Sequence, residues 1–231
     1  MSSFGGDDLD EVEVIRAANA VVNMADALPD LPRECPAGAA AGGPFRLTYC
    51  TSSSLPPKLT LRLFHIFESN MKAIYEQTWG WDRNVKMKEL FHPASRFIIV
   101  SKTEHEQRLE QGQGQRETVQ SLQAENIVAF TMYRFDWDDE DEPEHPVLYC
   151  YELQVAPDSR GHGFGRFLMS LLVTIADKLR MWKVVLTCLK HNAPAMAFYL
   201  HCGFGIDANS PSSFGHADEE YEILSNKPLI K

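Results

Sequence analysis

Apolar residues recur along the chain with two different periods, and segments of the two kinds alternate. Helical spacing of apolar residues predicts helices over residues 8–28, from Pro56 onward and over residues 165–181. Shorter runs rich in β-branched and aromatic residues predict strands over residues 45–51, 96–101, 127–136, 147–155 and 184–189. The strands 127–136 and 147–155 are expected to pair antiparallel, and helices and strands alternate after them. This order predicts an α+β domain with a mixed, twisted central β-sheet flanked by helices.

Composition divides the chain into an N-terminal segment and a larger domain. Residues 1–7 are expected to be disordered, and residues 8–28 form the predicted helix, which ends before Pro29. Residues 29–44 contain Pro, Gly and a run of alanines, which is typical of a linker. We therefore predict that residues 1–44 are a helix and linker packed on a domain of residues 45–231. Residues 102–125 are polar and rich in Gln and Glu, which predicts a solvent-exposed insertion between two strands.

Charge and size narrow the classes of partner. A chain of 231 residues with 44% hydrophobic content can bury one sizeable core, and one such domain can work as a monomer. The 22 Lys and Arg residues against 32 Asp and Glu residues give a net charge of −10. This balance argues against direct nucleic-acid binding through a basic face and is compatible with a cationic partner.

Cysteine and histidine usage indicates neither disulfides nor a metal. The five cysteines are odd in number and include no C-x-x-C pair, which favours a reducing compartment. The eight histidines lack metal-ligand spacing, so we expect no metal. No charged-then-apolar leader opens the sequence and no apolar run approaches about 18 residues, so neither secretion nor membrane association is expected.

A glycine-rich loop joins a predicted strand to a predicted helix. It reads Arg160-x-x-Gly163-x-Gly165, with Gly161 before and Arg166 after the central positions. The spacing differs from the dinucleotide G-x-G-x-x-G motif, and no Gly-Lys-Ser/Thr follows. Closely spaced glycines allow several backbone N–H groups to converge on one anion at the start of a helix. At this point a phosphate-binding loop and a plain glycine-rich turn both remain open.

A second pattern follows about thirty residues later, as Asn192-x-x-Ala195-x-x-Phe198-Tyr199-x-x-x-Gly203-Phe204. Together the two patterns resemble the signatures of the GNAT acetyltransferase superfamily. Asn192 is also a good helix N-cap, and Gly203 is a good stop signal. The resemblance implies the GNAT fold and acetyl-CoA as acetyl donor, with the pyrophosphate held by the glycine loop. The implied cofactor-binding residues are Leu153, Gln154, Val155, Arg160, Gly161, His162, Gly163, Phe164, Gly165, Arg166 and Asn192.

Four further blocks resemble one branch of that superfamily, the NatD family of histone N-terminal α-acetyltransferases. The blocks run from Met71 to Trp81, from Tyr133 to Asp136, from Leu148 to Glu152 and from Lys190 to Asn192. The resemblance implies acetylation of the N-terminal serine of core histones that begin Ser-Gly-Arg-Gly, in the cytoplasm and the nucleus. It leaves nuclear entry and contact with the ribosome open. The implied substrate-binding residues are Tyr75, Trp79, Asp136, Tyr149, Tyr151, Thr187, Asn209 and Tyr221.

Acyl transfer to an amine needs a proton acceptor, and Glu152 is the carboxylate best placed for that task. In strict strand alternation Glu152 faces away from Tyr149 and Tyr151. Either a bulge near Leu153 turns Glu152 toward the amine, or Glu152 acts through a water; a charge on a solvated sheet face is the third reading. Such a bulge would also free a backbone N–H to polarise the thioester carbonyl.

The resemblance adds Tyr151 as a catalytic residue and Tyr199 as the acid that protonates the leaving thiolate. Tyr199 is equally compatible with a packing role beside the cofactor, and relatives can have phenylalanine there. Cys150 lies among tyrosines in an apolar strand, which fits a buried thiol better than a nucleophile.

Asp136 begins an acidic cluster that continues to Glu144. Its carboxylate is expected to pair with the arginine at the third substrate position, while a solvated hairpin tip explains the rest of the cluster equally well. Two other functions stay open: a GNAT enzyme acting on lysine or small amines, and a non-catalytic module that binds acetyl-CoA or a peptide.

Overall fold

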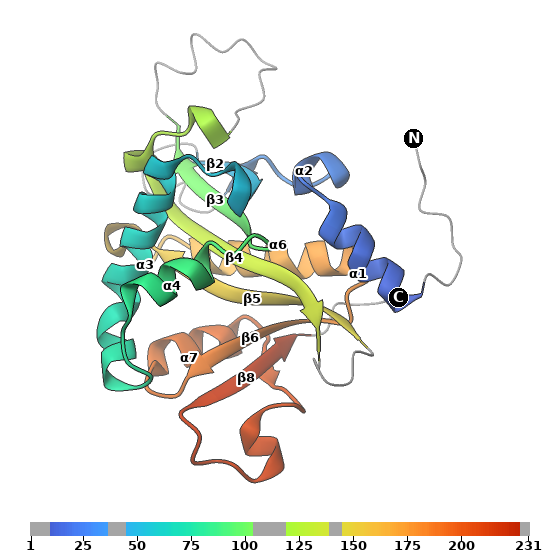
Figure 1. Ribbon diagram of the computed structural model, residues 1–231, viewed down its shortest axis with the longest axis vertical. Helices are drawn as coiled ribbons and strands as arrows, with labels where there is room; N and C mark the ends of the chain where they lie inside the picture. Colours follow the sequence, from blue (N-terminus) through green and yellow to red (C-terminus); the bar gives the residue numbers. More distant parts are fainter. Residues whose placement is uncertain (1–9, 37–44, 104–118, 139–144, 227–231) are drawn as a thin grey trace.

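The computed structural model describes residues 10–36, 45–103, 119–138 and 145–226 (Figure 1). The predictions for residues 1–7, for most of the insertion at 102–125 and for the acidic residues Glu140 to Glu144 lie outside these ranges. The last part of the expected insertion, residues 119–125, is described and differs from the prediction. Val119 is 7% exposed and Leu122 is 2% exposed, and both pack in a hydrophobic core. The polar composition of the segment concealed these two buried residues.

Within the described residues, eight strands form one sheet in the order β1-β2-β3-β4-β5-β6-β8-β7. All neighbouring strands are antiparallel except β5 and β6, which run parallel, so the sheet is mixed as predicted. Because β5 returns to β6 through helix α6, the parallel pair contains the crossover connection that parallel strands require. The strands are β1 (Glu34–Cys35), β2 (Phe45–Thr51), β3 (Arg96–Lys102), β4 (Ile127–Trp137), β5 (Pro146–Val155), β6 (Lys183–Leu189), β7 (Gly205–Ile206) and β8 (Tyr221–Asn226).

Helices cover both faces of the sheet. In Figure 1, α3 and α4 lie in front of the sheet and α6 lies behind it. The α-helices are α1 (Glu11–Ala20), α2 (Met24–Ala27), α3 (Pro57–Gln77), α4 (Arg83–Leu90), α6 (Phe164–Lys178) and α7 (Ala193–His201). Short 3-10 helices are η2 (Ser52–Ser54), η3 (Val119–Ser121), η4 (Ala124–Asn126), η5 (Pro157–Ser159) and η6 (Pro211–Phe214).

Each face of the sheet has its own hydrophobic core. The apolar stripe of α6, which includes Leu168, Leu172 and Ile175, packs with α1 against one face. The stripe of α3, which includes Leu63 and Phe67, packs against the other face. These stripes consist of the apolar residues that recur at helical spacing in the sequence. Burial of one apolar face therefore stabilises each of the two helices.

The N-terminal segment forms two short helices instead of one. The chain leaves α1 at Val21, and the side chain of Asn23 accepts a hydrogen bond from the Ala25 N–H to begin α2. Arg96, which is 6% exposed, donates to the carbonyl groups of Asn19 and Val21 at 2.7 and 3.1 Å. These bonds satisfy carbonyls that the end of α1 leaves unpaired and fix the segment on the domain. Helix α4 and strands β1, β7 and β8 were not predicted.

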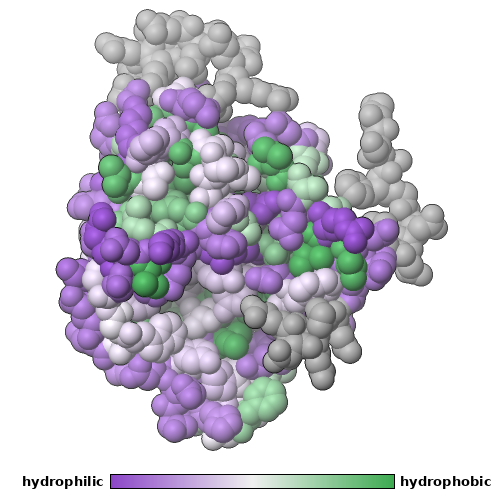
Figure 2. Space-filling model, viewed as in Figure 1, coloured by the Kyte–Doolittle hydropathy of each residue, from purple (hydrophilic) through white to green (hydrophobic). Residues whose placement is uncertain are grey.

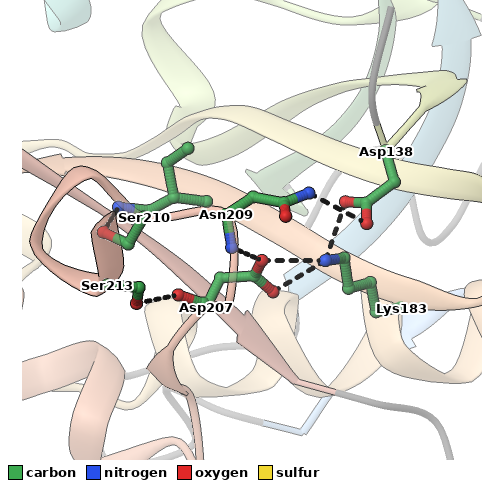
Figure 3. A network of polar contacts seen from close by, with 7 residues as sticks. Asp138, Lys183, Asp207, Asn209, Ser210 and Ser213 are labelled. Atoms are coloured by element: carbon green, nitrogen blue, oxygen red, sulfur yellow. Dashed lines mark hydrogen bonds and ion pairs between the residues drawn. The ribbon is translucent and has the colours of Figure 1, made fainter. Parts of the chain in front are cut away.

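A buried ion pair connects three parts of the sheet far apart in the sequence (Figure 3). Lys183 at the start of β6 lies 2.7 Å from Asp138, beyond the end of β4, and 2.8 Å from Asp207, in the loop after β7. Asn209 donates its backbone N–H to Asp207 and its side-chain N–H to Asp138, at 2.8 and 3.2 Å. The network therefore positions the segment that leads to β8.

Polar residues predominate on the face of the molecule shown in Figure 2, and the apolar residues there form small separate groups. Among the helices of the described ranges, none has the length and apolar character needed to span a membrane.

Candidate active site

A cavity of about 1150 Å³ opens where β5 and β6 separate. The parallel pairing of these strands stops at Tyr149 and Val185, although β5 continues to Val155. Beyond Tyr149, the peptide groups on this edge of β5 therefore have no β6 partner within the described residues. The cavity extends from the glycine loop and α6 on one side to α3 and α4 on the other.

A β-bulge in β5 brings Glu152 to the same face as two tyrosines. Met132 pairs with Glu152 and the next residue of β4, Tyr133, pairs with Cys150, so Tyr151 is an extra residue on β5. One extra residue reverses the alternation, and Tyr149, Tyr151 and Glu152 all line the cavity. We predicted such a bulge near Leu153, and the extra residue lies two positions earlier, at Tyr151.

The carboxylate of Glu152 lies against the cavity wall, partly shielded from water. Burial raises the pKa of Glu152 to about 7, while a hydrogen bond from Gln154 and the charge of Lys86 act in the opposite direction. The Gln154 Nε2 atom donates to Glu152 Oε2 at 2.7 Å. Near neutral pH Glu152 therefore changes between its two protonation states, which is the property required of a proton acceptor.

The glycine loop has the geometry of an anion-binding site. Gly161 and Gly163 have φ values of +78° and +85°, which side chains with a Cβ rarely adopt. Gly163 is the N-cap of α6, and no side chain caps the free N–H groups of that helix. A Cβ on Gly165 would lie 3.1 Å from the Phe198 ring, so α6 and α7 approach closely here.

The loop and its surroundings fit the diphosphate and pantetheine parts of acetyl-CoA. Arg160 and Arg166 line the cavity and bring positive charge beside the free N–H groups of α6. Phe198 and Leu153 provide an apolar wall further in. Within the described residues, no group of three or more His, Cys, Asp or Glu side chains is placed to hold a metal ion.

Helix α7, which the second sequence pattern predicts, also lines the cavity. Asn192 accepts a hydrogen bond from the Ala195 N–H at 3.3 Å and also lines the cavity. Gly203 has a φ of +85° just beyond the helix. Burial raises the pKa of Tyr199 well above its ordinary value, so its hydroxyl stays protonated and can donate. Burial raises the pKa of Cys150 to about 12, so this thiol is not a nucleophile at neutral pH.

Aromatic side chains form the wall opposite the glycine loop. The rings of Tyr75 and Trp79 lie 6.1 Å apart, and those of Tyr149 and Tyr151 lie 4.5 Å apart. The hydroxyl of Tyr149 is hydrogen-bonded to Thr187 across the gap between β5 and β6. Such a wall combines apolar area with a few hydroxyl groups, as binding sites for small or extended ligands commonly do.

The structure brings most of the predicted site residues together. Of the predicted catalytic residues, Glu152, Tyr151 and Tyr199 line the cavity, and so do all the predicted cofactor residues except His162. Of the predicted substrate residues, Tyr75, Trp79, Tyr149, Tyr151 and Thr187 line it as well.

Three of the predicted substrate residues, Asp136, Asn209 and Tyr221, are not part of this lining. Asn209 belongs to the Lys183 network, and the Tyr221 ring packs on Trp79 at 5.7 Å. Asp136 lies at a second cavity of about 540 Å³. Arg134 of β4 lines both cavities.

Asn70, Lys86 and Glu89 line the main cavity without having been predicted. Lys86 forms an ion pair with Glu89 at 2.8 Å and lies 4.2 Å above the Tyr75 ring. Both charges come from α4, a helix whose weak apolar pattern gave no signal. Asn70 directly precedes the Met71 block on α3.

Comparisons with known proteins identify a family and related folds. A family model described as the acetyltransferase (GNAT) family matches residues 71–204. A putative GNAT-family acetyltransferase from Desulfovibrio desulfuricans is 17% identical, with 79% of this chain and 99% of that one covered and a TM-score of 0.51. A GNAT-family acetyltransferase from Listeria monocytogenes is 12% identical, with 84% and 99% covered and a TM-score of 0.51. Nourseothricin acetyltransferase is 21% identical. The match covers 59% of this chain and 66% of the length of that protein, with a TM-score of 0.39.

Proposed function

The chain belongs to the acetyltransferase (GNAT) family, and we propose that it transfers the acetyl group of acetyl-CoA to the N-terminal α-amine of a protein, in particular of histones that begin Ser-Gly-Arg-Gly. The observation that carries this proposal is Glu152 at the bulge of β5, half-shielded at the cavity wall with a pKa of about 7. The α-amine as acceptor is supported by the similar pKa values of Glu152 and an α-ammonium group. The histone sequence is supported by the aromatic side chains of the cavity and by Asp136.

An α-ammonium group has a pKa of about 7.7 to 8.0, so transfer of its proton to Glu152 is uphill by only about 1.4 kcal/mol. A lysine ammonium has a pKa of about 10.4, and the same transfer is uphill by about 5 kcal/mol. Glu152 can therefore deprotonate an α-amine readily and a lysine poorly. This difference favours an N-terminal substrate over a lysine side chain.

The remaining residues of the cavity supply the other requirements of acyl transfer. When bound, acetyl-CoA supplies an acetyl group activated as a thioester. The peptide N–H groups of β5 beyond Tyr149, which have no β6 partner in the described structure, are available to polarise a carbonyl oxygen. Tyr199 stays protonated and donates a hydrogen bond to the leaving sulfur. Because Cys150 remains a thiol, the amine attacks the donor directly without an acyl-enzyme.

The wall opposite the glycine loop favours a short, flexible N-terminus with an arginine at its third position. Tyr75, Trp79 and Tyr149 line this side of the cavity, and we expect their rings to favour small residues such as Ser and Gly at the N-terminus of the substrate. Further along β4, the Asp136 carboxylate accepts a hydrogen bond from the Tyr151 hydroxyl at 3.4 Å. Its Oδ1 atom accepts the backbone N–H of Trp137 at 3.0 Å. Each carboxylate oxygen can accept a further hydrogen bond, so Asp136 can pair with a guanidinium group, and charge-assisted pairs of this kind are strong.

Assays of the wild-type protein and of Asp136→Asn, each with an arginine peptide and an alanine peptide, test the proposal. We expect Ser-Gly-Arg-Gly peptides to be acetylated with a kcat/KM about 10- to 100-fold above that of Ser-Gly-Ala-Gly peptides, as one charged hydrogen bond allows. Asp136→Asn should reduce this ratio to a few-fold, with little effect on the alanine peptide. An N-terminally blocked peptide that contains lysine is the control and should remain unmodified. Equal rates for the two free peptides would refute the proposed preference for Ser-Gly-Arg-Gly. Acetylation of the blocked peptide would refute the proposal that the acceptor is the α-amine.

A further inference from the structure

A continuous chain of hydrogen bonds joins the glycine loop to Glu152. Arg160, in the loop, donates to the Oδ1 atom of Asn70 on α3. The Nδ2 atom of Asn70 donates to Gln154 Oε1 at 2.9 Å and to the Val155 carbonyl at 3.0 Å. The Nε2 atom of Gln154 donates to Glu152 Oε2 at 2.7 Å. Three elements, the loop, α3 and β5, are thus connected through side chains.

The directions of the bonds in this chain follow from Arg160, which only donates, and from the Val155 carbonyl, which only accepts. A guanidinium group only donates, so the Asn70 atom that faces Arg160 is the carbonyl oxygen, and its NH₂ group faces Gln154. Gln154 must then present its own oxygen to Asn70 and its NH₂ group to Glu152. The amide orientation of Gln154 is therefore fixed through Asn70, which Arg160 orients from one side and the Val155 carbonyl from the other.

This orientation suits a carboxylate that has to accept a proton. Gln154 is 4% exposed, so water does not replace its NH₂ group as a donor to Glu152. Its bond stabilises the ionised form of Glu152 and fixes the Oε2 atom, which leaves Oε1 to take the proton. Reversal of Gln154 would place an amide oxygen against the carboxylate and disfavour ionisation.

We propose that Asn70 and Gln154 are positioning residues that hold Glu152 ready to accept a proton, with Arg160 of the cofactor loop and the Val155 carbonyl together orienting Asn70. This inference rests on the proposed role of Glu152. Other groups near Glu152 are Lys86 and Glu89 on α4, Tyr75 on α3, Cys150 on β5 and Tyr199 on α7. None of them donates to the Oε2 atom in place of Gln154, and the variants below leave all of them unchanged.

Gln154→Met and Asn70→Ala test the proposal, with Ser69→Ala as the matched control. Ser69 is the exposed neighbour of Asn70 on α3, and its hydroxyl bonds only within the helix, to Ile66. Loss of one hydrogen bond to a charged group should raise the Glu152 pKa by about one to two pH units in Gln154→Met. Asn70→Ala leaves Gln154 in place but removes the group that orients it, together with the bonds to Arg160 and the Val155 carbonyl, and should raise the Glu152 pKa by about half a unit to one unit.

Two measurements report the pKa of Glu152. The first is the acid limb of kcat/KM against pH; a shift of about one unit lowers activity about fivefold at pH 7, and the loss disappears near pH 9. The second needs no acetyl-CoA: an infrared titration of the carboxyl band that Glu152→Gln removes. Both should shift in Gln154→Met and Asn70→Ala and stay at the wild-type position in Ser69→Ala.

A purely structural role predicts a different result. Activity would then fall by one factor across the whole pH range, and the carboxyl band would titrate as in the wild-type protein; that result overturns the proposal. If the wild-type protein transfers no acetyl group, the proposed function fails, and the infrared titration alone decides the inference. An unshifted band in Gln154→Met overturns it, and a shifted band supports it.

Discussion

Replacing Lys183 with methionine tests how the fold holds the region that leads from β7 to β8. The Lys183 side chain is 4% exposed and lies 2.7 Å from Asp138 and 2.8 Å from Asp207. Methionine has a similar volume and no charge, so the change leaves two carboxylates close together, and that of Asp207 is only 3% exposed. The perturbation therefore removes a charge without creating a large cavity.

The expected loss follows from the partners that remain. Breaking a buried ion pair on one side costs about 3 to 5 kcal/mol because a buried charge is left uncompensated. Here Asp207 keeps the Asn209 N–H at 2.8 Å and Asp138 keeps the Asn209 side chain at 3.2 Å. These two bonds compensate part of the loss, so we expect the free energy of unfolding to fall by about 3 kcal/mol, the lower end of that range.

The pH dependence provides a second check with a definite sign. Burial opposes ionisation of Asp207, but hydrogen bonds from Lys183 and other donors hold the pKa of that carboxyl below its ordinary value. Its stabilising contribution is therefore complete above the unfolded pKa of about 3.9 and is lost as the pH falls through the lower, folded value. In Lys183→Met, burial is no longer opposed by the lysine, so the difference from wild type should shrink as the pH falls from about 7 to below 4.

Urea unfolding at neutral pH measures this effect, with Lys178→Met as the control. Lys178 lies 3.4 Å from Asp30, but the two side chains are 34% and 82% exposed, so the control should lose at most about 1 kcal/mol. Adding Asp207→Asn to Lys183→Met removes the uncompensated charge and should restore part of the stability. A loss in Lys183→Met no larger than in the control would refute the reasoning.

Three further changes have defined outcomes. Tyr199→Phe should lower kcat by about tenfold, since it removes a donor to the leaving sulfur; steady-state kinetics with an unchanged turnover number would leave Tyr199 only a packing role. Gly163→Ala should lower the free energy of unfolding by about 1 to 2 kcal/mol, because φ is +85° there, and should weaken CoA binding in calorimetry. The control Gly205→Ala should change neither quantity, because Gly205 has no positive φ and its added Cβ would meet no atom within 4 Å. Thr187→Val removes the partner of the Tyr149 hydroxyl and should raise the peptide KM a few-fold while the KM for acetyl-CoA stays the same; an unchanged peptide KM would contradict a role in the substrate wall.

The elements with strong local signals could be predicted from the sequence. The apolar stripes of α3 and α6 and the Asn192 cap of α7 follow from spacing and capping chemistry, and all three are confirmed. The residues of the glycine loop predicted a tight turn, with a phosphate-binding loop and a plain turn both open, and the positive φ values at Gly161 and Gly163 agree with that turn.

Features that depend on pairing between distant segments were harder to predict. The bulge at Tyr151 arises from the register of β4 against β5, and no residue in the strand marks its position. Helix α4 carries a weak apolar pattern, so Lys86 and Glu89 were missed at the cavity. The placement of Asn209 in the Lys183 network likewise depends on three segments that meet only in the folded chain.

The most direct test of the account is to locate the acetyl group by fragmentation mass spectrometry after a Ser-Gly-Arg-Gly peptide is incubated with acetyl-CoA and the protein. The account predicts one acetyl group on the N-terminal amine, none on an N-terminally blocked copy that contains lysines, and a rate reduced by about 100-fold or more in Glu152→Gln at neutral pH. Acetyl groups on lysine, or an undiminished rate in Glu152→Gln, would contradict it.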